Sequence, residues 1–149
     1  MLLGCFLLAP GVLARSFLAC GHPSYPPVSW HAQGELVGLA PHVVRQLFHE
    51  QGHEVRMLAL GNWKRCLLEA QQGRVDIVVA AYRTRARETW LGFTREALVA
   101  DPIVLFTQRD KPVPFTRWDE LRGRTVGLLL GDSFGDQFDD FATQHLNVE

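Results

Sequence analysis

From residue 73 to residue 87 the chain reads GRVDIVVAAYRTRAR, which indicates a helix end, a buried strand and then a polar loop. Gly73 suits the left-handed conformation that closes a helix. Residues 77–81 form an unbroken apolar run, typical of a strand covered on both faces in a parallel sheet. Ligands of open α/β sheets bind outside the carboxyl ends of the strands. Polar side chains just past residue 81 are therefore candidates for a binding site.

The polar loop carries two hydroxyl groups, on Tyr82 and Thr84, and three arginines, Arg83, Arg85 and Arg87. A guanidinium there could bind a small anion, because its planar fork matches a carboxylate. Three arginines near a strand end are also typical of solvated surface charge. Spacing alone leaves both interpretations open.

The preceding segments predict alternating strands and helices that lead into this strand. We expect strands at 17–20 and 54–60, a helix that opens at Pro41 and ends at Gly52, and a helix that Asn62 caps. This order implies parallel strands joined by crossover helices, an α/β fold.

The loop from Gly21 to Pro27 carries Tyr25, and Trp30 follows it. Aromatic side chains at a strand's carboxyl end can wall a ligand pocket. Ordinary packing of Trp30 against the next helix is the alternative. Gln33-Gly34 predicts a turn.

The segments after residue 87 predict a second alternation of elements. We expect a short helix or turn at 86–93, strands at 103–107 and 125–130, a short helix after Thr116 that Gly123 closes, and a helix at 137–145. Residues 109–114 are polar and broken by proline, so they are a candidate linker.

Composition narrows the function classes. The chain has 149 residues, 47% of them apolar, and a net charge of -1. This length and apolar content suffice for a core. With no basic stripe, the sequence does not indicate a nucleic-acid partner.

Residues 1–14 are apolar and uncharged, and predict an export signal cleaved near Ala14. The run is too short to span a bilayer, which needs ~20 residues. A buried N-terminal strand or helix is the alternative. Residues 2–5 resemble a lipoprotein box, with Cys5 as a lipid anchor only if the true start lies upstream.

Two further cysteines, Cys20 and Cys66, fall on a predicted strand and a predicted helix face. An oxidising compartment would permit a bridge between them. We nevertheless expect two buried free thiols.

One motif matches the zinc-protease helix pattern H-E-x-x-H, from His49 to His53. Zinc binding would need both histidines on one helix face. Gly52 predicts that the helix stops before His53, so we expect a solvated helix end and no metal.

A second motif, Gly131–Gly135, has the spacing of a nucleophile elbow, with Ser133 at its centre. Only His145 and a few carboxylates follow it, which disfavours a hydrolase. A small-residue loop before a helix can instead bind an anion through backbone N–H groups, or simply serve as a turn.

An ordered set of short motifs over residues 17–149 resembles the periplasmic solute-binding proteins of family 3, the polar amino acid transporter type. The motifs are Pro26-Pro27 with Trp30, Gly34 to Gly38, Trp63, Gly73 to Asp76, Thr84 to Arg87, Phe93-Thr94, Asp119 to Gly123, and Val126-Gly127 before Gly131. Ala86, His42 and the segment 95–97 depart from the family's usual residues.

The resemblance implies a two-lobed Venus flytrap fold, with a parallel-sheet α/β lobe at 15–108 and the start of a second, incomplete α/β lobe at 109–149. It also implies that Arg87 clamps a ligand's α-carboxylate, with Thr84 and Tyr82 beside it. Residues 131–135 would offer backbone donors from the second lobe. The candidate ligand-binding residues are Arg87, Thr84, Tyr82, Tyr25, Trp30, Trp63, Asp132 and Ser133.

The function implied is capture of a small carboxylate-bearing solute, an amino acid or a relative, in the periplasm for an ABC permease. We expect a monomer that is not an enzyme and has no cofactor, and that meets the membrane only through the transporter or a lipid anchor. The alternatives are a ligand-sensing module, a dehydratase-like enzyme on the same scaffold, or a fragment without function.

Overall fold

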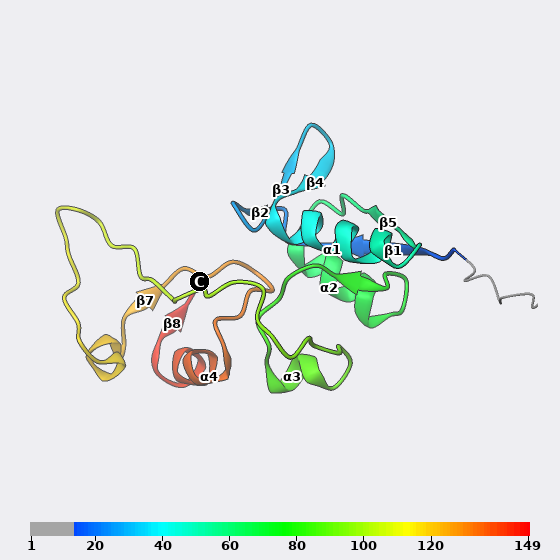
Figure 1. The fold of residues 1–149 in the computed structure, drawn as a ribbon. Coiled ribbons are helices and arrows are strands. Elements are labelled where there is room, and N and C mark those ends of the chain that lie inside the picture. Colours follow the sequence, from blue (N-terminus) through cyan, green and yellow to red (C-terminus); the bar gives the residue numbers. More distant parts are fainter. Residues whose placement is uncertain (1–13) are drawn as a thin grey trace, which may run out of the picture.

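The computed structural model describes residues 14–149, and a three-stranded parallel sheet lies at the centre of its N-terminal part (Figure 1). β1 (Ser16–Cys20) pairs with β5 (Glu54–Met57) on one side and β6 (Ile77–Val78) on the other. Two helices, α1 (Leu39–Glu50) and α2 (Trp63–Gln71), make the crossovers. The strand–helix alternation predicted from the sequence is confirmed.

Successive residues of β1 point to opposite faces of the sheet, and each face has its own apolar cluster. Ala19 belongs to the cluster that contains Ala40 of α1, whereas Cys20 belongs to the cluster with Trp63 and Cys66 of α2. Both β1 residues have no exposed surface. The sheet is therefore covered on both faces, as the apolar strands predict.

The helix ends follow the predicted local chemistry with one exception. The Asn62 side chain accepts a hydrogen bond from the Arg65 N–H at 2.8 Å and caps α2. Gly52 and Gly73 have φ values of 76° and 70° just past α1 and α2. Pro41, expected at the first helical position, is instead the third residue of α1.

Along the chain, the segment between β1 and α1 forms a small antiparallel sheet that the sequence did not predict. It consists of β2 (Ser24–Tyr25), β3 (Ser29–Ala32) and β4 (Glu35–Val37). The predicted turn at Gln33-Gly34 joins β3 to β4, with positive φ at both residues.

The C-terminal part has its own short sheet and an aromatic cluster. β7 (Thr125–Val126) pairs in parallel with β8 (Asn147–Val148), and α4 (Asp136–His145) connects them. The short 3-10 helix η1 (Trp118–Leu121) places the Trp118 ring 5.5 Å from Phe138 and 5.8 Å from Phe141. The helix expected at 137–145 is confirmed.

Four predicted strands are wrong or too long: the strands expected at 54–60 and 77–81 end at Met57 and Val78, and the other two lie in the C-terminal part. Residues 103–107 form no strand, and Phe106 is 92% exposed. The strand expected at 125–130 ends at Val126, and Leu130 is 71% exposed. Among residues 14–149, no strand pairs with residues 103–107 or 127–130, so these apolar residues do not extend a sheet. At the short helix or turn expected at 86–93, the structure has the single-turn helix α3 (Arg85–Glu88), followed by a turn at residues 89–90.

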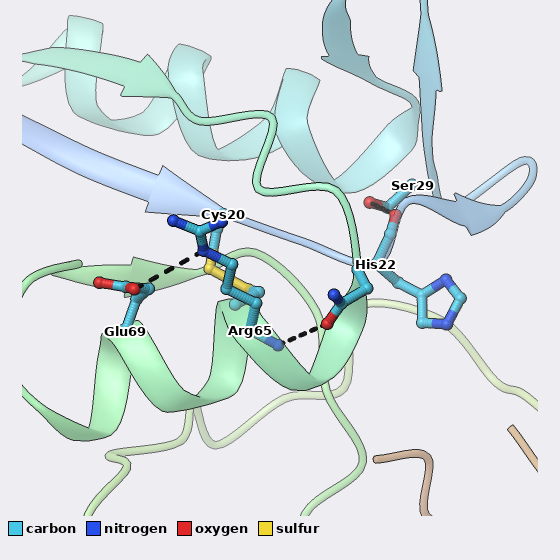
Figure 2. Close-up of a disulfide and its surroundings, with 7 residues drawn as sticks. Cys20, His22, Ser29, Arg65 and Glu69 are labelled. Carbon is cyan, nitrogen blue, oxygen red and sulfur yellow. Dashed lines mark hydrogen bonds and ion pairs between the residues drawn. A yellow bond between two sulfur atoms is a disulfide. The ribbon is translucent and has the colours of Figure 1, made fainter. Parts of the chain in front are cut away.

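The two cysteines form a disulfide, so the expectation of free thiols is wrong (Figure 2). Their positions were correctly predicted, on β1 and on α2. Because α2 packs on the same face of β1 to which Cys20 points, their Cα atoms lie only 5.7 Å apart. This separation suits a disulfide.

The predicted export signal and the lipid-anchor interpretation of Cys5 concern residues that lie, except for Ala14, outside the described range. Within residues 14–149, no helix has the length and apolar character needed to cross a bilayer.

The disulfide closes a loop across a sequence separation of 46 residues. Replacing both Cys20 and Cys66 by alanine should lower the free energy of unfolding by about 2–4 kcal/mol, because the unfolded chain gains freedom. Urea unfolding of both proteins, with and without reductant, measures this. Equal stability of the variant and the unreduced parent would contradict the expectation.

Candidate functional site

The carboxyl ends of β1 and β6 face a loop from the C-terminal part, and the candidate residues gather there. Thr84 is the N-cap of α3, and its hydroxyl accepts a hydrogen bond from the Arg87 N–H at 3.2 Å. Thr84 and Arg87 are 5% and 7% exposed. The single turn of α3 therefore directs Arg87 back towards the strand ends rather than into solvent.

The Arg87 guanidinium lies between two backbone carbonyl groups. Its Nη1 donates to the Tyr82 carbonyl and its Nη2 donates to the Gly131 carbonyl, both at 3.0 Å. Its central carbon lies 5.7 Å from the centroid of the Trp63 ring. A guanidinium has five N–H donors, so three remain for other partners.

Burial lowers the pKa of Arg87, while the nearby Asp132 and Asp139 carboxylates act in the opposite direction. Arginine stays protonated in proteins despite such shifts. The site thus contains a buried positive charge that has no direct ion pair among its recorded contacts.

The loop 131–135 lies against the first turn of α2. Gly131 has a φ of +90°, and a Cβ atom there would sit 3.3 Å from the Lys64 Cα. His22 lies two positions past β1, and its Nε2 is 3.4 Å from Asp132 Oδ1. Ser133 donates to Asp139 of α4 instead of facing Arg87, and its Oγ accepts from the Gly135 N–H.

Two tyrosines meet at one carboxylate beside this loop. The Tyr25 and Tyr82 hydroxyl groups both donate to Asp101 Oδ2. Burial, followed by the hydrogen bond and charge of Asp101, raises the pKa of Tyr25 to about 12 and raises the pKa of Tyr82 as well. Phenolate is disfavoured because it would face a carboxylate in a partly desolvated position.

Most of the predicted site residues are therefore close together. Contacts link Arg87 to Thr84, Tyr82 and Trp63. Trp30 is not among these contacts: it pairs with Ser24 of β2 and with Val37 of β4, and lies near Gly38. Its role in walling a ligand pocket therefore stays a prediction, with ordinary packing as the alternative.

Sequence reasoning missed His22 and Asp101. The strand-end rule that selected Tyr82 applies equally to His22, so the signal was present. No sequence signal pointed to Asp101, because it belongs to an irregular segment that reaches the site only through the tertiary fold.

The H-E-x-x-H motif does not form a helical pair, since α1 ends at Glu50 before His53 is reached. The described residues contain no group of three or more His, Cys, Asp or Glu side chains suited to a metal ion. A concavity of about 630 Å³ near His49 and His53 lies at the amino ends of β1 and β5, away from Arg87.

Residues 18–144 match the bacterial extracellular solute-binding proteins, family 3. Among solved structures, an ancestral arginine-binding protein bound to arginine is 19% identical at a TM-score of 0.64, over 90% of this chain and 59% of its own. Holo ArgBP from T. maritima is 16% identical at a TM-score of 0.65, over 90% of this chain and 58% of its own.

A histidine kinase sensor domain with similarity to periplasmic binding proteins is 21% identical at a TM-score of 0.66, over 91% of this chain and 59% of its own. No curated protein sequence matches the chain. The chain thus spans about three-fifths of these solved structures. At these identities the likeness establishes the fold, a periplasmic-binding-protein α/β fold of which part is present.

The tyrosine pair gives a prediction that is readily measured, because Tyr25 and Tyr82 are the only 2 tyrosines in the sequence. Asp101→Asn removes the carboxylate charge, so both phenol pKa values should fall towards the ordinary 10.0. Titration of phenolate absorbance in the ultraviolet reports both groups.

The raised pKa of Tyr25 also makes the stability of the folded protein depend on pH. Because the Tyr25 pKa is raised in the folded state, its contribution to stability is complete below pH 10 and is lost as the pH rises through about 12. Asp101→Asn should weaken this alkaline loss. An unchanged titration curve in the variant would show that Asp101 does not control the phenols.

Proposed function

Since the chain belongs to the bacterial extracellular solute-binding proteins of family 3, we propose that it binds a small carboxylate-bearing solute, an amino acid or a relative. Binding takes place between an N-terminal lobe, residues 15–108, and a second α/β unit that begins at residue 109. The protein acts outside the cytoplasm and delivers its ligand to an ABC permease without changing it chemically.

The observation that supports this best is the buried Arg87 guanidinium, which has three N–H donors free of recorded contacts. A carboxylate can take two parallel hydrogen bonds from such a group. Gly131, whose carbonyl now accepts from Nη2, belongs to the facing loop, so a ligand between lobe and loop would replace or adjoin that contact.

Arg87 cannot supply the affinity alone. A charge-assisted hydrogen bond contributes ~1.5–3 kcal/mol net, whereas micromolar binding requires ~8 kcal/mol. The Trp63 ring beside Arg87, the tyrosine pair and the N–H groups of residues 131–135 are the proposed sources of the remainder.

Contacts between the two parts are compatible with opening. Arg85 of α3 pairs with Asp136 at 3.4 Å and with Asp140 at 2.8 Å. The Arg85 side chain is 72% exposed, and exposed ion pairs typically contribute only ~0–1 kcal/mol. Such contacts would guide closure over a ligand without preventing its release.

The disulfide supports the proposed location outside the cytoplasm. Disulfides persist in oxidising compartments such as the periplasm and are rare in the cytosol. Cys20 and Cys66 form such a bridge. The export signal proposed for residues 1–14 is compatible with this location.

Sensing is the second candidate, because a histidine kinase sensor domain shares the fold. Transport and sensing would use the same ligand site and differ in the partner that recognises the loaded form. Ligand-dependent stimulation of a permease ATPase in proteoliposomes would support transport.

Arg87→Ala tests the proposed role of the guanidinium, by calorimetric titration against a panel of amino acids. We expect the best ligand of the parent protein to lose at least tenfold in affinity, because its carboxylate loses a charged partner. Arg83→Ala is the matched control, since Arg83 lies in the same loop and pairs with Glu88 at the surface.

Thermal unfolding of both variants separates loss of binding from loss of folding. Equal affinity in Arg87→Ala and Arg83→Ala, both folded, would refute the assignment of the carboxylate to Arg87. Absence of binding by the parent protein to every member of the panel would refute the proposed ligand class.

A further inference from the structure

We propose that His22 contacts the bound ligand as a hydrogen-bond donor and selects solutes whose side chain ends in an acceptor, a carboxamide or a carboxylate. The inference rests on the proposed function, because His22 borders the same site as Arg87. The sequence analysis selected the loop from Gly21 to Pro27 for its Tyr25 and gave His22 no role.

The hydrogen-bond pattern identifies the nitrogen that carries the proton. The Ser24 backbone N–H donates to His22 Nδ1 at 3.1 Å. Nδ1 must therefore present its lone pair, so the neutral imidazole carries its hydrogen on Nε2. Nε2 is a donor and requires an acceptor.

The structure provides no good acceptor for this donor among the described residues. His22 is 9% exposed, and its Nε2 is buried without a hydrogen-bond partner. Asp132 Oδ1 lies 3.4 Å from Nε2 but forms no hydrogen bond with it. A buried donor left unpaired is destabilising, so an acceptor supplied by a ligand would relieve that cost.

The imidazole ring is held in place from two sides. It lies 5.9 Å from the Tyr25 ring and 5.5 Å from the Trp63 ring, centroid to centroid. Figure 2 shows the ring projecting from the segment after β1, away from the disulfide. The Cys20–Cys66 bridge joins β1 to α2 two residues before His22, which restricts the movement of the backbone that carries the imidazole.

The two polar groups lie beside the same aromatic ring. Trp63 contacts both residues, because Arg87 lies over its ring and His22 packs beside it. A ligand whose α-carboxylate meets Arg87 would therefore extend its side chain along Trp63 towards Nε2. A side chain with only donors, such as lysine, leaves Nε2 unpaired.

Calorimetric titration with glutamine, glutamate, norleucine and lysine tests this selectivity. The parent protein should bind glutamine or glutamate about tenfold or more tightly than norleucine, because only the former pair carries a side-chain acceptor. His22→Phe keeps a ring between Tyr25 and Trp63 but removes the donor, so this preference should disappear. His22→Gln restores a donor and should recover part of it.

His31→Phe is the matched control. His31 lies on β3, and its Nε2 is also buried without a hydrogen-bond partner. Its replacement removes the same chemical group and should leave the ratio of glutamine to norleucine affinity unchanged. Nitrogen-15 NMR of the imidazole provides a readout independent of folding stability: Nε2 should carry the proton, and its signal should shift on addition of glutamine.

The outcomes separate the two proposals. If the parent binds norleucine or lysine as tightly as glutamine, or if His22→Phe retains the preference, the role of His22 is overturned while the proposed function stands. If the parent binds none of the four and no other amino acid, the proposed function fails and this inference fails with it. If His22→Phe does not fold, the parent's own selectivity and His22→Gln decide.

Discussion

The burial of one guanidinium is the constraint on which the rest of the structure depends. Arg87 is 7% exposed, and it donates to carbonyl groups of Tyr82 and Gly131 from two distant parts of the chain. A buried charge without such partners would be prohibitively costly. The capped turn of α3, the end of β6 and the loop before α4 are all positioned so that these partners reach it.

The N-terminal scaffold makes this arrangement rigid. Cys20 and Cys66 join β1 to α2, and the Asp76 side chain accepts a hydrogen bond from the Leu18 N–H of β1 at 2.8 Å. Two independent ties thus fix β1 to its neighbours immediately before the strand ends. This rigidity holds His22 and Trp63 in positions that a flexible loop could not maintain.

The C-terminal part is constructed differently. Its sheet has two strands of two residues each, and Trp118 and Phe138 belong to an aromatic cluster beside it. Phe106 and Leu130 remain exposed, because residues 103–107 and 128–130 pair with no strand in the described range. Facing a rigid N-terminal scaffold, this looser part is the one better suited to move when a ligand binds.

The sequence by itself determined the alternation of elements, the glycine helix ends, the Asn62 cap and the placement of Arg87 past β6, because these follow from local periodicity and backbone chemistry. Only the tertiary structure decided that Cys20 meets Cys66, that Asp101 joins Tyr25 and Tyr82, and that Leu130 has no strand to pair with. Each of these outcomes depends on which distant segments come together, and the pattern of neighbouring residues along the chain does not determine those contacts.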